Sequence, residues 1–141
     1  MKREMPTIVI GIILMTIALS GCQEEAVTTE RTFEGIFFES NILELTNASL
    51  DLTKGKGGET VRAEAIFYFR NKLDKGIDNL KFSIEFCDKN NNVLHSRPYQ
   101  YNTIFPAGYS ESSASRVPYI GDNVGYTDHV NIITTNYNIV E

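Results

Sequence analysis

Three oxygen-bearing side chains alternate along one short polar segment of the chain: Asp88, Asn90 and Asn92. A calcium-binding loop begins with alternating oxygen ligands, and its sixth position is glycine and its twelfth a bidentate glutamate. Here Val93 occupies the sixth position and Tyr99 the twelfth, so two essential parts of such a loop are missing. Asp and Asn also favour tight turns. We therefore expect a hairpin turn, with a metal site at Asp88, Asn90 and Asn92 as the alternative.

The other side chains that could act as nucleophiles, acids, bases or metal ligands are Cys87, His95 and His129. The histidines lie in no nucleophile or zinc-binding motif, so structural or surface positions are expected for both. Cys87 is in phase with the polar residues of its segment and is expected to be a semi-buried residue, with a reactive thiol or an intermolecular disulfide as the alternative. Catalysis or metal capture would require both histidines to converge with Asp88 and Asn90 in one pocket.

The first 22 residues have the layout of a secretory signal. Lys2 and Arg3 give a basic start, and an apolar run of 12 residues extends from Ile8 to Leu19. A helix that crosses the hydrocarbon core of a membrane needs roughly 20 residues, so spanning is disfavoured. The segment Leu19-Ser20-Gly21-Cys22 resembles the lipobox of prokaryotic lipoproteins, which has a branched apolar residue, two small residues and the cysteine that receives the lipid.

The lipobox resemblance implies cleavage before Cys22 and a diacylglyceryl thioether on its sulfur. Stable attachment generally takes two hydrophobic signals, which two acyl chains such as palmitate supply. The resemblance thus implies a lipoprotein held on the extracytoplasmic face of the cell membrane through the lipid on Cys22. The alternative is an uncleaved signal anchor in which Cys22 is a plain thiol.

Composition and charge restrict the remaining partners. The chain has 141 residues, of which 42% are hydrophobic and 22% charged, as in one globular domain. Removal of residues 1–21 takes away Lys2, Arg3 and Glu4, so 13 positive and 18 negative side chains become 11 and 17, and the net charge changes from −5 to −6. Proteins that bind nucleic acid carry basic surfaces, so no nucleic-acid partner is expected. With Cys22 assigned to the lipid, one cysteine and two histidines are fewer than the four ligands of a structural zinc site, unless a second chain contributes, and no cofactor is expected.

A polar segment separates the signal from the rest of the chain. Residues 23–32 have no apolar periodicity and are predicted to be a flexible tether, which reaches at most about 35 Å when fully extended. Gln23 also differs from the aspartate that commonly retains lipoproteins in the inner membrane of Gram-negative bacteria. The predicted organisation is a signal peptide at 1–21, a lipidated cysteine and tether at 22–32, and a β-sandwich domain at 33–141.

Period-two alternation of apolar and polar residues predicts strands in the domain. It is clearest in Val61 to Phe69 and in Leu80 to Phe86, where every second residue is apolar. Further strands are expected near 41–52, 93–96, 99–104, 110–116 and 128–135, whereas 33–45 is ambiguous between helix and strand. Several short strands separated by turn residues are typical of an antiparallel sandwich or barrel.

The segment from Arg70 to Ser110 has a characteristic order of features. These are the Asn71 turn, the alternating block from Ile77 to Phe86, the polar turn that begins at Asp88, and Pro106 and Gly108 before a polar strand. This order resembles the FxLYD-type domain, an immunoglobulin-like sandwich common in prokaryotic lipoproteins and envelope proteins. Family members usually have an aromatic residue where this chain has Cys87, and a glycine where it has Asn91 and Asn92, but asparagine tolerates the left-handed conformation that such a turn needs.

These observations lead to one functional expectation and one alternative. The FxLYD resemblance brings no catalytic residues, so we expect a non-catalytic, lipid-anchored binding or interaction module, with another envelope protein as its partner. The alternative is a small envelope enzyme or a ligand- or metal-capturing protein. Asn47 also begins the sequon Asn47-Ala48-Ser49, which makes it a candidate for N-glycosylation on the motif alone.

Overall fold

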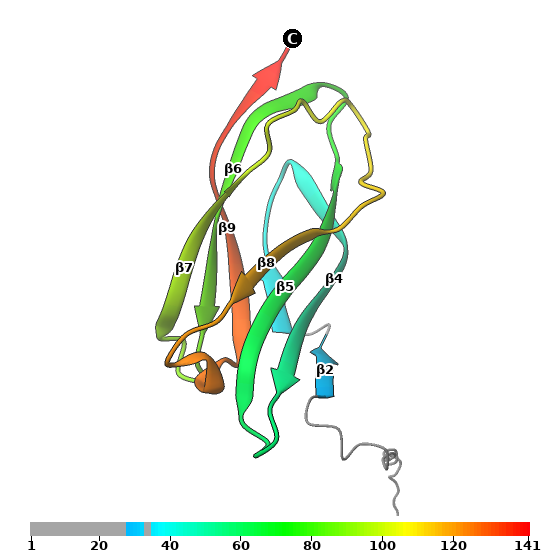
Figure 1. The fold of residues 1–141 in the computed structure, drawn as a ribbon. Coiled ribbons are helices and arrows are strands. Elements are labelled where there is room, and N and C mark those ends of the chain that lie inside the picture. The colour runs from blue at the N-terminus through cyan, green and yellow to red at the C-terminus, as the bar shows by residue number, and fades with distance from the viewer. Residues whose placement is uncertain (1–27, 33–34) are drawn as a thin grey trace, which may run out of the picture.

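The strands form two four-stranded sheets that lie face to face (Figure 1). In the computed structural model, which describes residues 28–32 and 35–141, the strand order is β2-β4-β5-β8 in the first sheet and β3-β9-β6-β7 in the second. Every strand pair is antiparallel except β3 with β9, which is parallel. The all-β sandwich predicted from the alternation is therefore confirmed.

The strand bounds follow the alternating segments closely. The first sheet consists of β2 (Thr28–Thr32), β4 (Leu43–Lys54), β5 (Thr60–Asn71) and β8 (Ser115–Tyr119). The second consists of β3 (Ile36–Phe38), β9 (His129–Val140), β6 (Gly76–Cys87) and β7 (Val93–Gln100). One short 3-10 helix, η4 (Val124–Tyr126), precedes β9. Among the described residues, no helix is long and apolar enough to span a membrane.

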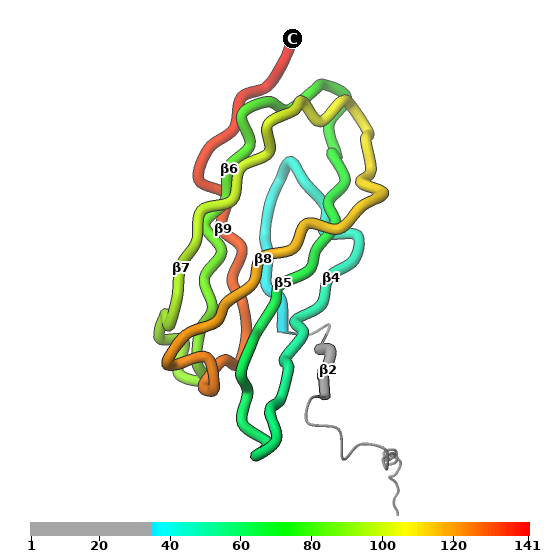
Figure 2. The backbone as a smooth tube through the Cα atoms, in the orientation of Figure 1, coloured from blue at the N-terminus to red at the C-terminus, as the bar shows by residue number. Residues whose placement is uncertain are grey.

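The chain passes repeatedly from one sheet to the other, as the tube in Figure 2 shows. It leaves the first sheet after β5, forms the β6–β7 hairpin, returns as β8 beside β5, and crosses again to place β9 beside β6. The β4–β5 hairpin and η4 lie at the lower end of Figure 1, and the end of β9 lies at the upper end.

Aromatic side chains fill the space between the sheets. Phe67, Phe69, Phe82 and Phe86 are fully buried, and they come from the inward positions of β5 and β6. The rings of Phe69 and Phe82 stack across the two sheets with centroids 5.0 Å apart. This is the expected result of period-two alternation, because one face of each strand must be apolar to close the core.

Two of the expected strand boundaries were wrong. The segment expected near 93–96 and the start of the one expected near 99–104 form one continuous strand, β7, which includes Pro98 and ends at Gln100, so residues 101–104 are not in a strand. A proline is tolerated there because β7 is an edge strand and needs no N–H on its outer side. The strand expected at 110–116 begins only at Ser115, because Glu111 fulfils a different role described below.

The N-terminal part of the domain also differs from expectation. Residues Thr28–Thr32, which the sequence assigns to the tether, form β2 and pair with β4 from Leu50 to Lys54. The chain therefore enters the sandwich opposite Lys54, next to the β4–β5 hairpin. The signal segment 1–21 and Cys22 lie outside the described residues.

Candidate functional site

The Asp88 segment is a hairpin turn that connects β6 to β7. The Oδ1 atom of Asp88 accepts hydrogen bonds from the backbone N–H groups of Asn90 and Asn92, each at 2.9 Å, and Asn92 Nδ2 donates to Oδ2 at 3.1 Å. These donors, the backbone N–H of Asn92 foremost, hold the pKa of Asp88 below its ordinary value. Asn91 has φ = 66°, the left-handed conformation expected of an asparagine in this turn. Both carboxylate oxygens of Asp88 therefore stabilise the turn itself.

His129 lies beside this turn at the start of β9. Its Nδ1 is 2.9 Å from the Oδ2 of Asp128, and its Nε2 is 2.9 Å from the Oδ1 of Asn91. The ring of Phe37 meets the imidazole edge-on, with centroids 5.3 Å apart. Both ring nitrogens of His129 thus already have partners that fix the orientation of the ring.

Cys87 lies under the same cluster and is more deeply buried than the semi-buried position expected. Its residue surface is fully buried, and Asn131 Nδ2 lies 3.6 Å from its Sγ. Burial, with the nearby carboxylate of Glu85, raises the pKa of the thiol. A buried thiol with a raised pKa is a weak nucleophile.

His95 lies apart from the other candidates. It sits on β7, where its ring stacks almost parallel on Tyr119 at 4.6 Å. Asp88 and Asn90 instead line a hollow of about 300 Å³ beside residues 125–128. The four residues of the alternative hypothesis therefore do not converge in one pocket, and no group of three potential metal ligands occurs among residues that the structure describes.

Asn47 is exposed in the middle of β4, but its sequon partner is not accessible. Ser49 is only 8% exposed and donates its hydroxyl hydrogen to Asp51 Oδ1 at 3.0 Å. A transferase that must contact the Ser49 hydroxyl would have to act before the sheet forms.

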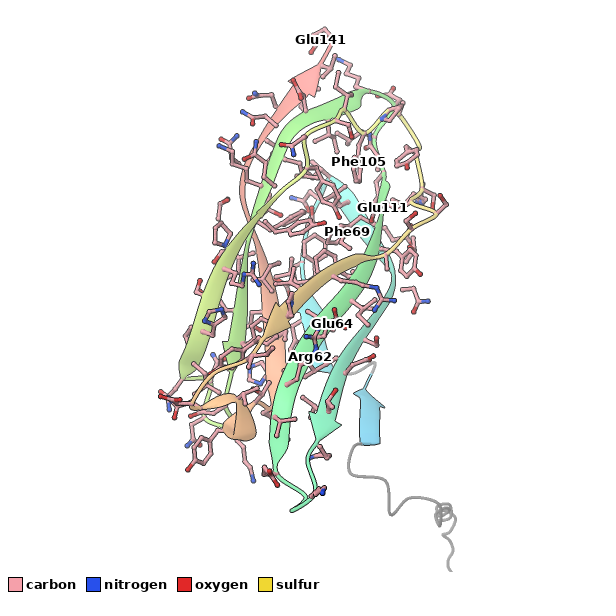
Figure 3. The ribbon with its side chains drawn as sticks, viewed as in Figure 1. Arg62, Glu64, Phe69, Phe105, Glu111 and Glu141 are labelled. Atoms are coloured by element: carbon pink, nitrogen blue, oxygen red, sulfur yellow. The ribbon has the colours of Figure 1, made fainter. Side chains whose placement is uncertain are left out.

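A polar cluster that the sequence did not indicate closes the edge of β5 above β8 (Figure 3). The Glu111 carboxylate accepts from the backbone N–H of Phe69 at 2.5 Å, and the backbone N–H of Glu111 donates to the Phe69 carbonyl at 3.1 Å. Nearby, the hydroxyls of Tyr101 and Ser115 are 2.5 Å apart. Burial raises the pKa values of Glu111 and Tyr101. This cluster replaces missing strand pairing, so its role is structural.

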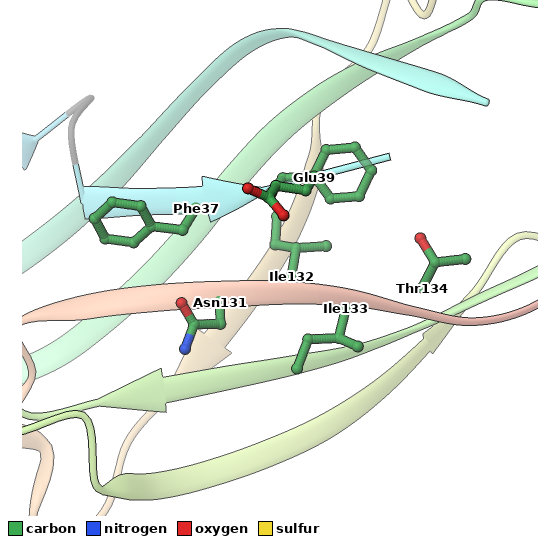
Figure 4. A pocket seen from close by; sticks show the side chains of 7 residues that line it. Phe37, Glu39, Asn131, Ile132, Ile133 and Thr134 are labelled. Carbon is green, nitrogen blue, oxygen red and sulfur yellow. The ribbon is translucent and has the colours of Figure 1, made fainter. Parts of the chain in front are cut away.

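A concave surface of the second sheet lies between β3 and β9 (Figure 4). This β3–β9 groove has a volume of about 560 Å³ and is lined by Phe37, Phe38, Glu39, Asn131, Ile132, Ile133 and Thr134. It exists because β3 ends at Phe38, opposite Ile132, whereas β9 continues. The Oγ1 atom of Thr134 is buried there without a hydrogen-bond partner.

The lining of the groove is suited to binding. Phe37 and Ile133 are 54% and 43% exposed, and among the described residues of the lining Glu39 is the one with a charged side chain. Exposed apolar side chains with a few polar groups between them are typical of contact surfaces. No sequence pattern indicated this groove, because residues 33–45 have no clear periodicity and the alternation at 128–135 does not show that β9 extends beyond the end of β3.

Comparison of this chain with models of protein families, with curated protein sequences and with solved structures gave no match.

Proposed function

We propose that this protein is a lipid-anchored, extracytoplasmic β-sandwich that acts as a non-catalytic interaction module of the cell envelope. The observation that supports the interaction role most directly is the β3–β9 groove, where apolar side chains remain exposed and β9 extends beyond the end of β3. By contrast, the side chains that could perform chemistry are held in turn-closing or packing contacts: Asp88 in its turn, His129 between two partners, and His95 against Tyr119.

The lipid anchor is supported by the sequence Leu19-Ser20-Gly21-Cys22 behind an apolar run of 12 residues. The immunoglobulin-like type of the sandwich is part of the same proposal. It is supported by the crossings that place β8 beside β5 and β9 beside β6, in the manner of a Greek key. The parallel pairing of β3 with β9 is a departure from a purely antiparallel sandwich.

Lipidation is tested by metabolic labelling of the full chain with an alkyne analogue of palmitate in a bacterial host. We expect label on the wild-type protein and none on the Cys22→Ser variant. Cys87→Ser is the matched control, because it removes the other cysteine and should keep the label. Equal labelling of wild type and Cys22→Ser would refute the anchor.

The interaction role is tested with a photo-crosslinking amino acid placed at Ile133 in the groove. Val93 is the matched control, because it is similarly exposed, at 51% against 43%, but lies at the start of β7. We expect a discrete, reproducible adduct from position 133 and none from position 93. The absence of any discrete adduct at position 133 in intact cells would favour a passive spacer and refute the interaction module.

A further inference from the structure

The upper part of β9 has a free edge. β3 pairs with β9 only from Val130 to Ile132, but β9 continues to Val140. On the other side β6 follows β9 to that end, with Gly76 opposite Val140. No strand among the described residues pairs with the outer side of Asn136–Val140, which we call the upper β9 edge. An open edge of this kind is a template for another strand.

Other edges of the sandwich carry the usual protection against such pairing. β7 contains Arg97 and Pro98, and β8 contains Arg116 and Pro118. The charge and the missing N–H hinder the addition of a further strand. In contrast, β9 has neither charge nor proline from Val130 to Val140.

The charge pattern indicates what can occupy the upper β9 edge. The domain that follows the signal is acidic, with net charge −6 if the first 21 residues are removed, so two copies carry the same net charge and repel each other as they approach. The uncharged edge is a place where they can meet without this repulsion. The upper β9 edge carries no charge that could pair with a basic or an acidic peptide, so neither kind of peptide is favoured as its partner.

The side chains of the upper β9 edge are also self-complementary. Ile139 is paired with the buried Ile77 and therefore lies on the core-facing side of the sheet, as does Tyr137 two residues earlier. Both nevertheless remain exposed, at 38% and 43%. A register shift near Thr135 separates this stretch from the part of β9 beside β3, so it can pair independently.

We propose that two copies of this chain associate through antiparallel pairing of their upper β9 edges, with a two-fold axis at Asn138. In this register Tyr137 of each copy lies opposite Ile139 of the other, which forms two aromatic to β-branched contacts of the kind that stabilise antiparallel pairs. Asn138 lies opposite Asn138 of the second copy. The second sheets of the two copies then join into one continuous sheet. β3 is not displaced, because its pairing ends at Ile132.

This dimer rests on the proposed interaction role, because it makes a second copy of the chain the partner at the upper β9 edge, and it does not depend on lipidation. The first test is disulfide cross-linking of the full chain in detergent-solubilised membranes. Across the two-fold axis the Cα atoms of position 138 would be about 4.5–5.5 Å apart, within the range that a disulfide bridges, about 4.4–6.8 Å. We expect Asn138→Cys to give a disulfide-linked dimer as the major species after mild oxidation.

Gln100→Cys is the matched control, because it also places an exposed cysteine on an edge strand, β7, at the same end of the sandwich. It should give no disulfide-linked dimer, and neither should the wild-type chain, in which Cys87 is buried. Equal cross-linking of Asn138→Cys and Gln100→Cys would overturn the proposal, because it would show random collision.

The second test needs no oxidation. Sedimentation of the wild-type chain in detergent over a range of concentrations should show a mass that doubles. Tyr137→Lys should abolish the doubling, because it removes both Tyr137–Ile139 contacts and places two lysines as diagonal neighbours across the axis. Tyr126→Lys is the control, since Tyr126 is exposed but lies in η4 at the opposite end. A wild-type monomer at all concentrations would overturn the dimer. The Ile133 photo-adduct could still form with another protein, so the interaction module would fail only on its own test.

Discussion

Asn71 is the side chain whose removal should weaken the fold most clearly. It is fully buried at the end of β5, where its Nδ2 lies within 3.0 Å of the carbonyl oxygens of Lys75, Phe105 and Pro106. Its Oδ1 accepts from the backbone N–H of Leu73 at 2.9 Å. One amide therefore ties the β5–β6 turn to the loop that follows β7.

The Asn71→Ala substitution should destabilise the protein by about 3–5 kcal/mol. The two Nδ2 hydrogens of Asn71 serve three carbonyl oxygens and its Oδ1 accepts once, so about three hydrogen bonds are lost at roughly 1 kcal/mol each, with a further cost for the carbonyl and N–H groups left buried and unpaired. Because the total stability of a domain is about 5–15 kcal/mol, the variant should still fold. With an m-value of about 2 kcal/mol/M, the midpoint of urea unfolding should fall by about 2 M.

The assay is urea unfolding followed by far-UV circular dichroism and tyrosine fluorescence, since the chain has no tryptophan. Asn102→Ala is the control, because it removes an exposed amide outside the strands and should change stability by less than about 0.5 kcal/mol. Asn71→Asp should cost more than Asn71→Ala at neutral pH, because it turns a carboxylate toward three carbonyl oxygens. A cost below about 1 kcal/mol for Asn71→Ala would refute the argument that these bonds hold the turn and loop together.

Three further predictions concern the titratable groups. Burial raises the folded-state pKa of Glu111, so its contribution to stability is present at acidic pH and is lost as pH rises through that pKa. Glu111→Gln should remove this loss. The urea midpoint of the variant should then fall less between pH 4 and 7 than that of wild type. Asp88 has the opposite pH dependence: its pKa is lowered in the folded state, so its contribution to stability is present above its unfolded-state pKa and is lost as pH falls. Asp88→Asn should therefore reduce the fall of the urea midpoint in acid, and a fall equal to that of wild type would contradict this. Cys87 should react with a maleimide far more slowly in the folded chain than in urea, and comparable rates in both states would show that the thiol is not buried.

The parts of the fold that the sequence predicted are those in which one face of a strand must be apolar. The alternating segments at Val61–Phe69 and Leu80–Phe86 became the two central strands, β5 and β6, because a half-buried strand in a sandwich requires that pattern. Edge strands are less constrained. β3 and β8 have three and five residues, and β2 is polar, so their sequences carry too few apolar positions for a period to be recognised.

The candidate sites divide in a similar way. The Asp88 turn was predictable because the turn depends on local hydrogen bonds from residues two and four positions later. The β3–β9 groove depends on the different lengths of two strands that are about 90 residues apart in the chain, and no local pattern records that difference. For the same reason, the pairing of Glu111 with Phe69 could not be inferred from the serine-rich segment around it.

The proposed anchor and the proposed dimer constrain each other. β2 begins at Thr28, opposite Lys54, at the end of the sandwich where β9 also begins (Figure 1). Asn138 is nine residues along β9 from His129, or about 30 Å at 3.3 Å per residue, so a two-fold axis there places the two Thr28 ends about 60 Å apart and facing in opposite directions.

Cys22 precedes Thr28 by six residues, which reach at most about 20 Å. Two lipids can then enter one membrane only if the long axis of the dimer lies along the surface. An upright dimer would hold one lipid far above the bilayer. Atomic force microscopy of the lipidated protein on a supported bilayer should therefore show the height of a sandwich lying on its side. Particles that rise about 60 Å or more would mean that the antiparallel dimer and the lipid anchor do not coexist in one membrane.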